Sequence, residues 1–363
     1  MQGKVWVLLG HKAGDNAQVM ALADALGWPV EEKHIHARAW EIVPHLLAGP
    51  TVAGIDRRGS SPLDPPWPDL VISAGRRNEP VARWIRARAG GGVRLVHIGR
   101  PWARPECYDL VVTTPQYFLD PAPNVLLNPL PLHRIARDEV DAAAARHGPR
   151  LAHLPRPFTT VLIGGDSGPF VLTPEKGRRL AEGMNRMVAQ TGGAALVSGS
   201  RRTPRAAASA FRAALDVPAE CFWWDERDKR AENPYRAFLG LADRFVVTGE
   251  SMSMLAEAGS LGRPLYIFDP GDPPGTWWRH WHNFRHKPLS HALAMRFAPV
   301  RMRRDVSRIE AALVRENRAR WLGDAPRLIA GGEDWVAGAQ ADPAQGARRA
   351  ADRIRALFTD LRR

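Results

Sequence analysis

The chain has 363 residues, of which 45% are hydrophobic, and this length and composition favour two domains that each bury a sizeable core. The two cysteines, Cys107 and Cys221, lie far apart, which argues against a disulfide framework and favours a reducing compartment. The net charge of +13 points to an anionic partner such as a nucleotide, a phospholipid surface or a nucleic acid, although an Arg-rich composition also arises from a GC-rich genome.

Neither a secretion signal nor a membrane anchor is expected from the sequence. The first residues, MQGKVWVLLG, lead directly into a strand, and no apolar run approaches the ~20 residues that span a bilayer. We therefore expect a cytoplasmic protein. An additional expectation is peripheral contact with anionic membrane at the inner face of the cytoplasmic membrane, through the Trp277–Trp281 loop and the C-terminal arginines Arg348, Arg349, Arg353 and Arg355.

The first half of the chain alternates strands and helices. The predicted strands are Val5–Leu9, Val30–His36, Leu70–Ser73, Val93–Ile98, Leu110–Thr113 and Asn124–Leu127, and the predicted helices are Asn16–Leu26, Trp40–Leu47, Pro80–Ala89 and Asp138–Arg146. Open α/β sheets bind ligands at the carboxyl ends of their strands. The candidates there are the polar turn residues Gly14, Asp15, Asn16, Gln18 and Arg76.

The alternation restarts after His147–Phe158, a stretch with three prolines and a glycine that predicts a linker. The strands Thr159–Ile163, Ala194–Ser198, Cys221–Trp224, Phe245–Val247 and Leu265–Phe268 are expected, with helices over Glu175–Gln190, Arg205–Leu215 and Pro234–Ala242. The fold class is therefore α/β, with two parallel-sheet domains at 1–150 and 151–340. Residues 341–363 then form an amphipathic C-terminal helix.

The stretch Arg244–Pro270 predicts a buried strand, a turn over Thr248–Ser251 and a short helix from Met252. Such a helix points its free N–H groups and the positive end of its dipole at the turn, which suits a phosphate. Ser251 could cap this helix, and Ser253 and Glu257 share one helix face. A carboxylate one turn below the phosphate is well placed to accept hydrogen bonds from a ribose.

Three turns of the second half therefore carry candidate binding residues. These are Gly164, Gly165, Asp166 and Ser167 after one strand, Arg201 and Arg202 after the next, and Gly249, Glu250, Ser251 and Ser253 after a third. Glycines allow close backbone approach, and an arginine pair suits a diphosphate. Each turn alone has an ordinary structural explanation, but three at one end of a parallel sheet favour a nucleotide-diphosphate site.

Metal ligation is not expected. Asp225, Glu226 and Asp228 are loosely spaced and read as a solvated loop. His280, His282 and His286 lie in a Trp-rich loop without a carboxylate or cysteine to complete a ligand set. This loop is expected to bind phosphate or to contact a substrate.

The motifs VLIGGDS, SGSRRTP, the NPY at Asn233–Tyr235 and VVTGESMSMLAEAGSLGRPLYIF resemble the elongated-mitochondria fission-factor family. Its bacterial members are described as candidate glycosyltransferases. In the first half KAGDNAQ, SAGRR, YDLVVTTPQ and NVLLNPLPLHRI also match, so the likeness covers most of the chain. More distantly, ESMSMLAEA is similar to the donor site of the GT-B transferase that adds N-acetylglucosamine in murein synthesis. The family's first turn opens with an acidic residue where this chain has His11, so that residue's role does not carry over.

The resemblance implies a GT-B-like protein with two Rossmann-like domains, a cleft between them and the last helix packing back across. The C-terminal domain would hold a nucleotide-diphosphate sugar and the N-terminal domain a glycan or lipid-linked acceptor. Gly249, Ser251 and Ser253 would contact the diphosphate and Glu257 the ribose, with Asn233 also in the substrate site. Such transferases use helix dipoles and cations in place of a metal, and Arg201 and Arg202 could serve here. No cofactor is implied, because the sugar nucleotide is the donor substrate.

Transfer to an acceptor hydroxyl needs a general base. Asp15 is the first candidate and His133 the second, with Gln18 and Arg76 orienting acceptor or sugar. Asp15 could instead only cap a helix, and His133 could be a surface residue. Three other functions stay open: a non-catalytic adaptor, a sugar-nucleotide epimerase and a nucleic-acid binder. The last is disfavoured, because no nucleic-acid module is recognised.

Overall fold

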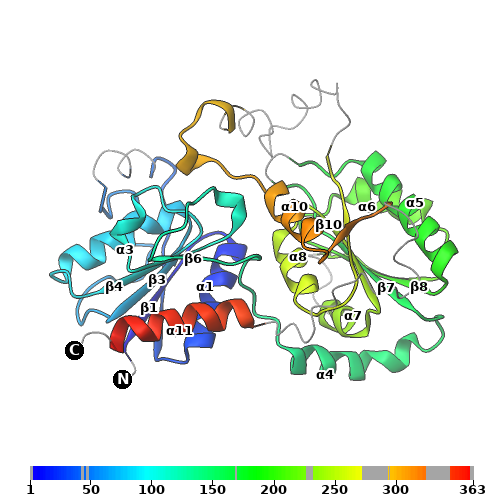
Figure 1. Cartoon of the computed structure of the whole chain (residues 1–363), viewed down its shortest axis with the longest axis horizontal. Helices are drawn as coiled ribbons and strands as arrows, with labels where there is room; N and C mark the ends of the chain where they lie inside the picture. Colours follow the sequence, from blue (N-terminus) through cyan, green and yellow to red (C-terminus); the bar gives the residue numbers. More distant parts are fainter. Residues whose placement is uncertain are drawn as a thin grey trace. The chain divides into compact units, whose positions relative to one another are not determined.

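The computed structural model describes residues 3–41, 45, 49–167, 170–225, 232–271, 293, 295–323 and 344–359. The chain forms two compact units, and each holds one six-stranded sheet in which every strand pairing is parallel (Figure 1). The first unit comprises Met1–Arg134, Pro299–Asp305 and Ala344–Arg363, and the second comprises Ile135–Ala298 and Val306–Pro343. The predicted fold class, α/β with two Rossmann-like parallel sheets, is confirmed.

The sheet of the first unit has the strand order β2-β1-β3-β4-β5-β6. Its strands are β1 (Val5–Leu9), β2 (Val30–His34), β3 (Leu70–Ala74), β4 (Arg94–Ile98), β5 (Leu110–Thr113) and β6 (Val125–Leu127). Strands β1 and β3 are buried throughout, as continuous apolar runs predict for central parallel strands. From β1 the chain builds outward in one direction to β2 and in the other to β3. The topological switch point, where such sheets bind ligands, therefore lies between β1 and β3.

Helices cover both faces of this sheet. Helices α1 (Ala13–Leu26) and α11 (Gln345–Thr359) lie side by side on one face, and α3 (Gly75–Arg88) covers the other (Figure 1). The rings of Trp28 and Phe358 meet edge to face, with their centroids 4.9 Å apart, where α11 packs beside α1. The C-terminal helix is thus part of the first unit's core.

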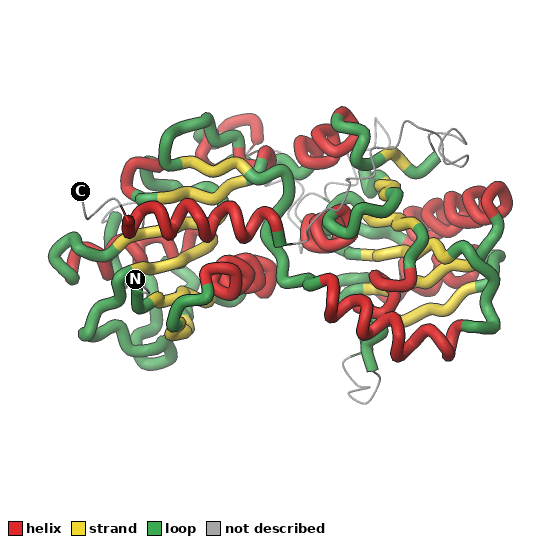
Figure 2. Tube along the Cα trace, turned by 60° about the horizontal axis from the view of Figure 1, so that its bottom comes forward, coloured by secondary structure: helices red, strands yellow, loops and turns green. Residues whose placement is uncertain are grey.

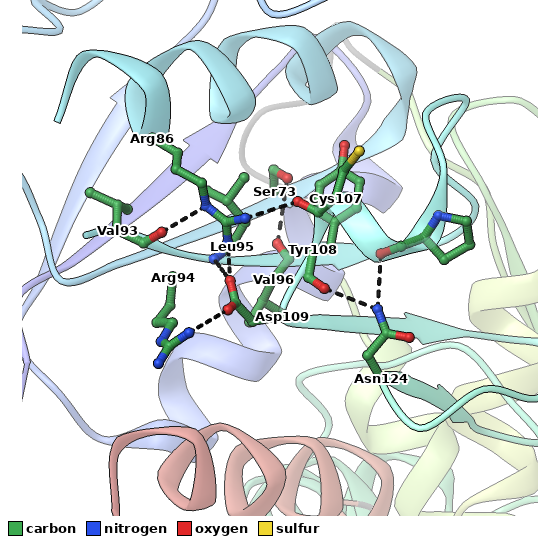
Figure 3. A network of polar contacts seen from close by, with 11 residues as sticks. Ser73, Arg86, Val93, Arg94, Leu95, Val96, Cys107, Tyr108, Asp109 and Asn124 are labelled. Atoms are coloured by element: carbon green, nitrogen blue, oxygen red, sulfur yellow. Dashed lines mark hydrogen bonds and ion pairs between the residues drawn. The ribbon is translucent and has the colours of Figure 1, made fainter. Parts of the chain in front are cut away.

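A polar network holds the loops at the amino edge of the same sheet (Figure 3). Arg86 on α3 donates to the carbonyls of Val93 and Cys107 at 2.9 and 3.1 Å, and pairs with Asp109. Asp109 also accepts from the N–H of Leu95 at 2.7 Å. These groups lie where the chain enters β4 and β5. The network therefore fixes the edge of the sheet that is opposite to the strand carboxyl ends.

The sheet of the second unit has the order β12-β11-β10-β7-β8-β9. Its strands are β7 (Phe158–Ile163), β8 (Ala194–Gly199), β9 (Ala219–Phe222), β10 (Arg244–Thr248), β11 (Leu265–Phe268) and β12 (Arg320–Trp321). Its helices are α4 (Arg137–His147), α5 (Pro174–Thr191), α6 (Arg205–Ala214), α7 (Tyr235–Leu241), α8 (Met252–Gly259) and α10 (Ser307–Arg315). Figure 2 shows the strands of each unit between layers of helix. Here the switch point lies between β7 and β10.

The first domain boundary differs from the one predicted at residue 150. Helix α4 packs on α7 of the second unit, and Gly240 permits this approach, because a Cβ there would lie 2.6 Å from the carbonyl oxygen of Val140. The second unit therefore begins at Ile135. The proline-rich stretch at 147–158, expected as a linker, lies inside that unit.

Two helices of the first unit begin earlier than predicted. Helix α1 starts at Ala13 rather than Asn16, and α3 starts at Gly75 rather than Pro80. Gly75 has a φ of +71°, which lets β3 pass directly into α3 without a loop. Asp15 and Arg76 consequently lie in first helical turns, not in loops.

The helix predicted at Trp40–Leu47 falls largely outside the described residues. Within the part of the chain that the structure describes, no helix is long and apolar enough to cross a membrane.

Candidate functional site

Three turns of the second unit meet at its switch point, as the sequence predicts. Gly164 and Gly165, after β7, contact the turns after both neighbouring strands. A Cβ on Gly164 would lie 2.7 Å from the Cβ of Ser251, and one on Gly165 would lie 2.1 Å from the carbonyl oxygen of Arg202. Gly165 also has a φ of +147°. Both glycines are therefore required by close packing between turns.

The buried side chain of Glu250 connects the turns after β7 and β10 by hydrogen bonds. It is 3% exposed, and its Oε1 accepts hydrogen bonds from the N–H of Gly165 at 2.7 Å and from the Thr248 hydroxyl at 2.9 Å. The same hydroxyl oxygen accepts from the N–H of Gly164 at 2.9 Å. The N–H groups of the two glycines are thus already used inside the protein, so the glycines shape the site rather than donate to a phosphate. Burial raises the pKa of Glu250.

The amino end of α8 supplies free donors beside Glu250. Ser251 occupies the N-cap position but makes no side-chain capping bond, contrary to expectation, because its side chain is buried against Gly164. The N–H groups of Met252, Ser253 and Met254 have no intrahelical acceptor, and no hydrogen bond among the described residues uses them. Three N–H groups and the helix dipole therefore point at the turn, as in an anion site.

Arg201 and Arg202 are both exposed at the mouth of β8. Arg202 donates to the carbonyl oxygen of Asp166 at 3.2 Å, whereas the guanidinium of Arg201 lies 4.6 Å from the ring centroid of Trp224. Arg202 is thus tied to the glycine turn, and Arg201 is displaced toward the loop after β9. The Asp166 carboxylate accepts from the N–H of Leu172 at 2.8 Å and shapes the same turn.

Glu257 lies one turn below the donors of α8 and pairs with a residue from another helix. The hydroxyl of Tyr235, on α7, donates to its Oε2. Burial raises the pKa of Glu257 to about 7, although this hydrogen bond opposes the rise. The Oδ1 of Asn233, just before α7, accepts from the N–H of Tyr235 at 3.0 Å. The NPY motif therefore positions Tyr235 on Glu257.

The remaining predicted residues of this unit lie at the same edge. Ser253 is exposed in the first turn of α8, and the backbone of Ser167 pairs with that of Phe170. Gly249 lies against the buried Glu310 of α10, since a Cβ there would lie 2.1 Å from a carboxylate oxygen. A larger residue at 249 would therefore displace Glu310.

The first unit has a pocket at its own switch point, which we call the β1–β3 pocket. It is lined by Gly10, His11, Lys12, Asp15, Asn16, Ala74, Gly75, Arg76, Arg77 and Asn78. Glu41, 6% exposed by side chain, is the shared counter-ion of two of these residues. It lies 2.9 Å from Arg76 and 3.0 Å from Arg77. Asn16 is used structurally, because its amide both accepts from and donates to the Gly10 backbone at 2.8 Å.

Asp15 is half-buried in this pocket, and no hydrogen bond of its carboxylate is found among the described residues. Its Oδ2 lies over the start of α3, 2.6 Å from the position of a Cβ on Gly75. The alternative interpretation of Asp15 as a helix cap therefore finds no support in the hydrogen bonds. His133, the second candidate base, lines neither described pocket, and burial lowers its pKa to about 4.

A second pocket of the first unit, which we call the β4–β6 pocket, opens at the ends of the next strands. It is lined by Gln18, Ile98, Gly99, Val112, Thr113, Thr114, Tyr117, Asn128, Leu130 and Leu132. Of the predicted residues only Gln18 lies here, and it reaches its own helix at Gly14 through a weak 3.4 Å contact. Gly14 is exposed.

Among the described residues, no group of three or more His, Cys, Asp or Glu side chains could hold a metal ion. The three histidines at 280, 282 and 286, like Glu226 and Asp228, lie outside the described residues.

A model of the family "Mitochondrial fission ELM1" matches residues 13–358. The chain belongs to this family. The resemblance of the motifs to it is thereby confirmed over most of the sequence.

Two relatives of this ELM1-family chain fit the assignment. The mitochondrial fission protein ELM1 of Arabidopsis thaliana is 25% identical over 238 residues, which is 60% of this chain and 55% of that protein. The uncharacterized protein RP120 of Rickettsia prowazekii is 24% identical over 298 residues, covering 73% of this chain and 83% of that one. The match thus spans about half the length of the plant relative.

Among solved structures, the chain is similar to UDP-GlcNAc 2-epimerase from Methanocaldococcus jannaschii, with 10% identity, a TM-score of 0.49 and coverage of 98% and 99% of the two chains. The S. aureus MnaA–UDP complex has 11% identity and a TM-score of 0.46, with coverage of 99% and 97%. An α,α-trehalose-phosphate synthase from Burkholderia vietnamiensis has 13% identity and a TM-score of 0.44, with 99% coverage of both.

Several residues of these sites were missed in the sequence. Glu41 and Tyr235 act through partners 35 and 22 residues away, and no local pattern marks such pairs. Thr113 and Asn128 do have a signal: they lie at or just after the ends of predicted strands, at the binding edge of the sheet.

Proposed function

We propose that this ELM1-family chain is a glycosyltransferase that uses a nucleotide-diphosphate sugar as donor. The second unit would bind the nucleotide, and the first unit the acceptor. The observation that carries the proposal is the uncapped amino end of α8 at the switch point between β7 and β10.

The donor diphosphate would accept hydrogen bonds from the free N–H groups of α8, with Arg202 as the nearby cation. The helix N–H groups and the cation would both stabilise the diphosphate without a metal. Glu257, one turn further along α8, would accept from the ribose hydroxyls. Its Oε2 is held by Tyr235, which leaves Oε1 for the ligand.

Asp15 would act as the general base in the first unit. It would remove the proton of an acceptor hydroxyl as the hydroxyl oxygen bonds to the anomeric carbon. The bond from that carbon to the diphosphate breaks, and the nucleoside diphosphate leaves with its electron pair. The support for Asp15 is its place in the β1–β3 pocket without a hydrogen-bonding partner among the described residues.

The donor half is tested by calorimetric titration with UDP, GDP, ADP and CMP sugars. We expect one nucleotide to bind with release of heat, and Arg202→Ala to weaken it by about 10- to 150-fold, the effect of losing one charge-assisted hydrogen bond. Arg212→Ala, on the helix that follows the same turn, is the matched control for charge. Equal affinity of wild type and Arg202→Ala would contradict the assignment.

The catalytic half is tested by Asp15→Asn with the donor identified above. We expect turnover to fall by roughly a hundred-fold or more, as on loss of a general base, while donor affinity stays the same. The substitution is nearly isosteric, and Asn is tolerated in a first helical turn, so a thermal midpoint close to that of wild type is expected. Near-normal turnover would remove Asp15 from the mechanism.

A further inference from the structure

The β1–β3 pocket has the character of a phosphate site. Helices α1 and α3 both begin at its wall, and neither has a side-chain cap. The pocket holds three cations, Lys12, Arg76 and Arg77, against two carboxylates, Glu41 beside the arginines and Asp15 in the wall, so one positive charge is left over. Lys12, also in the wall, forms no ion pair among the described residues. The dipoles of the two helices and the cationic side chains together favour the binding of an anion.

Asn78 offers the pocket a buried hydrogen-bond acceptor. This side chain is 3% exposed and lines the same pocket. Its Nδ2 donates to the Leu8 carbonyl at 2.9 Å, which fixes the orientation of the amide. Its Oδ1 has no partner among the described residues. A buried acceptor without a partner is costly, and a hydroxyl of a ligand would satisfy it.

The β4–β6 pocket also contains buried polar atoms without hydrogen-bonding partners, but no charged side chain is among the residues that line it. Thr113 and Asn128 are 2% and 1% exposed, and both Thr113 Oγ1 and Asn128 Oδ1 lack a partner in the part of the chain that the structure describes. Leu130 and Leu132 give the pocket an apolar wall. Little space lies between these groups, so the polar atoms on an apolar wall suit one hydroxyl-bearing end of a ligand rather than a whole molecule.

Asp15 links the two pockets. It lies three residues before Gln18 on α1, so the two side chains share one side of the helix while each lines a different pocket. Burial raises the pKa of Tyr117 in the β4–β6 pocket, and the charge of Asp15 contributes to that rise, so the carboxylate lies within electrostatic range. Strand spacing of ~4.8 Å places the ends of β3 and β5 about 10 Å apart. One sugar phosphate can bridge this distance.

We propose that the first unit binds a phosphorylated sugar, with the phosphate in the β1–β3 pocket and the sugar hydroxyls in the β4–β6 pocket. That this ligand is the acceptor rests on the function proposed above, whereas its binding does not. The hydroxyl nearest Asp15 would then be the nucleophile.

The test is calorimetric titration with the 1- and 6-phosphates of glucose, N-acetylglucosamine and mannose, compared with inorganic phosphate and the free sugars. At least one sugar phosphate should bind ten-fold or more tightly than inorganic phosphate. Lys12→Ala should weaken both sugar phosphate and inorganic phosphate by about three- to ten-fold. Arg88→Ala makes the same change in charge at the exposed far end of α3 and should alter neither.

Thr113→Val separates ligand binding from structure. It removes a buried hydroxyl that has no partner, so the free protein should keep or raise its thermal midpoint. The variant should lose affinity for the sugar phosphate about five-fold and keep that for inorganic phosphate. Loss of stability together with unchanged sugar-phosphate affinity would give Thr113 a structural role and overturn the second half of the site.

Arg202→Ala, in the second unit, distinguishes this inference from the proposed function. It should weaken the nucleotide sugar and leave the sugar phosphate unaffected. Binding of sugar phosphate without transfer would retain this site and remove the proposed function, whereas nucleotide binding without sugar-phosphate binding would overturn this site alone. If Arg202→Ala abolishes phosphate binding and Lys12→Ala does not, the anion site belongs to the second unit and the inference is wrong.

Discussion

Glu257 is a carboxyl group whose surroundings make the protonated form more favourable than it is in water. Burial on α8 raises its pKa to about 7, and the hydroxyl of Tyr235 holds one of its oxygens. A ribose hydroxyl donates more strongly to a carboxylate than to a neutral acid. The nucleotide should therefore bind preferentially to the deprotonated protein.

This preference predicts that donor affinity rises with pH between 6 and 8. With a pKa of about 7, about 9% of the protein carries the carboxylate at pH 6 and about 91% at pH 8, so affinity should rise up to ten-fold. A nucleotide sugar is the appropriate ligand, because its diphosphate diester does not titrate in this range. Calorimetry in buffers of different ionisation enthalpy should show proton release.

Glu257→Gln is the control for this prediction. Its neutral amide cannot titrate, so its affinity should be lower at pH 8 and flat across the range. A slope that persists in the Gln variant would assign the titration to another group.

At the scale of single residues, the sequence predicted the positions of individual side chains better than it predicted which side chains pair with each other. Spacing along α8 placed Glu257 one turn beyond the turn over Thr248–Ser251, because helical geometry is local. Its partner Tyr235 lies on a different helix, 22 residues earlier. Glu41 and Arg76 are likewise 35 residues apart. Such pairs depend on packing between elements, which no periodicity in the sequence records.

The turn after β7 is the element that brings the neighbouring turns together. Gly165 has a φ of +147°, and a Cβ would lie 2.1 Å from the carbonyl oxygen of Arg202. Any side chain at position 165 would overlap backbone atoms, which cannot move aside as the end of a flexible side chain can.

Gly165→Ala should therefore destabilise the protein by about 2 kcal/mol or more, from backbone strain and overpacking together. Urea unfolding measures this change. Gly92→Ala is a suitable control, because Gly92 has open space around it and no positive φ, so its stability should stay within about 0.5 kcal/mol of wild type. Equal stability of both variants would contradict the tight packing of the turn.

Element types were largely predictable, whereas some boundaries were not. Continuous apolar runs identified β1, β3 and β10, because buried parallel strands need them. The early start of α3 was missed, because Pro80 suggested a first helical turn although α3 already begins at Gly75. The two-residue strand β12 left no pattern to detect.

At the scale of the whole molecule, the chain passes between its units more than once. The first unit combines the N-terminal 134 residues with two later segments, 299–305 and 344–363. A proline-rich stretch suggested one boundary near residue 150. That signal reflects a turn inside the second unit, because α4 before it packs on α7. Composition marks loops, but only packing decides to which unit a helix belongs.

Helix α11 is the clearest example of a late segment of the chain that belongs to the first unit. Its apolar side, with Ile354 fully buried, packs in the core formed with α1, and Arg355 donates to the carbonyls of Ala25 and Leu26 at 2.9 and 3.1 Å. The apolar face predicted from the sequence thus covers the first unit. Arg355, one of the arginines expected at a membrane, is used to hold the helix in place.

Ile354→Ala should consequently weaken the first unit alone. Loss of a fully buried Ile side chain costs about 2–5 kcal/mol where the site does not collapse. Each unit has its own hydrophobic core, so calorimetry should show one transition moved to lower temperature and a second unchanged. A nucleotide sugar should raise the midpoint temperature of the second unit's transition only, since ligand binding stabilises the folded form that it binds. Ala356→Ser, on the same helix with its side chain exposed, should move neither transition. If Ile354→Ala instead lowers both transitions equally, the units unfold as one, and the assignment of α11 to the first unit's separate core is wrong.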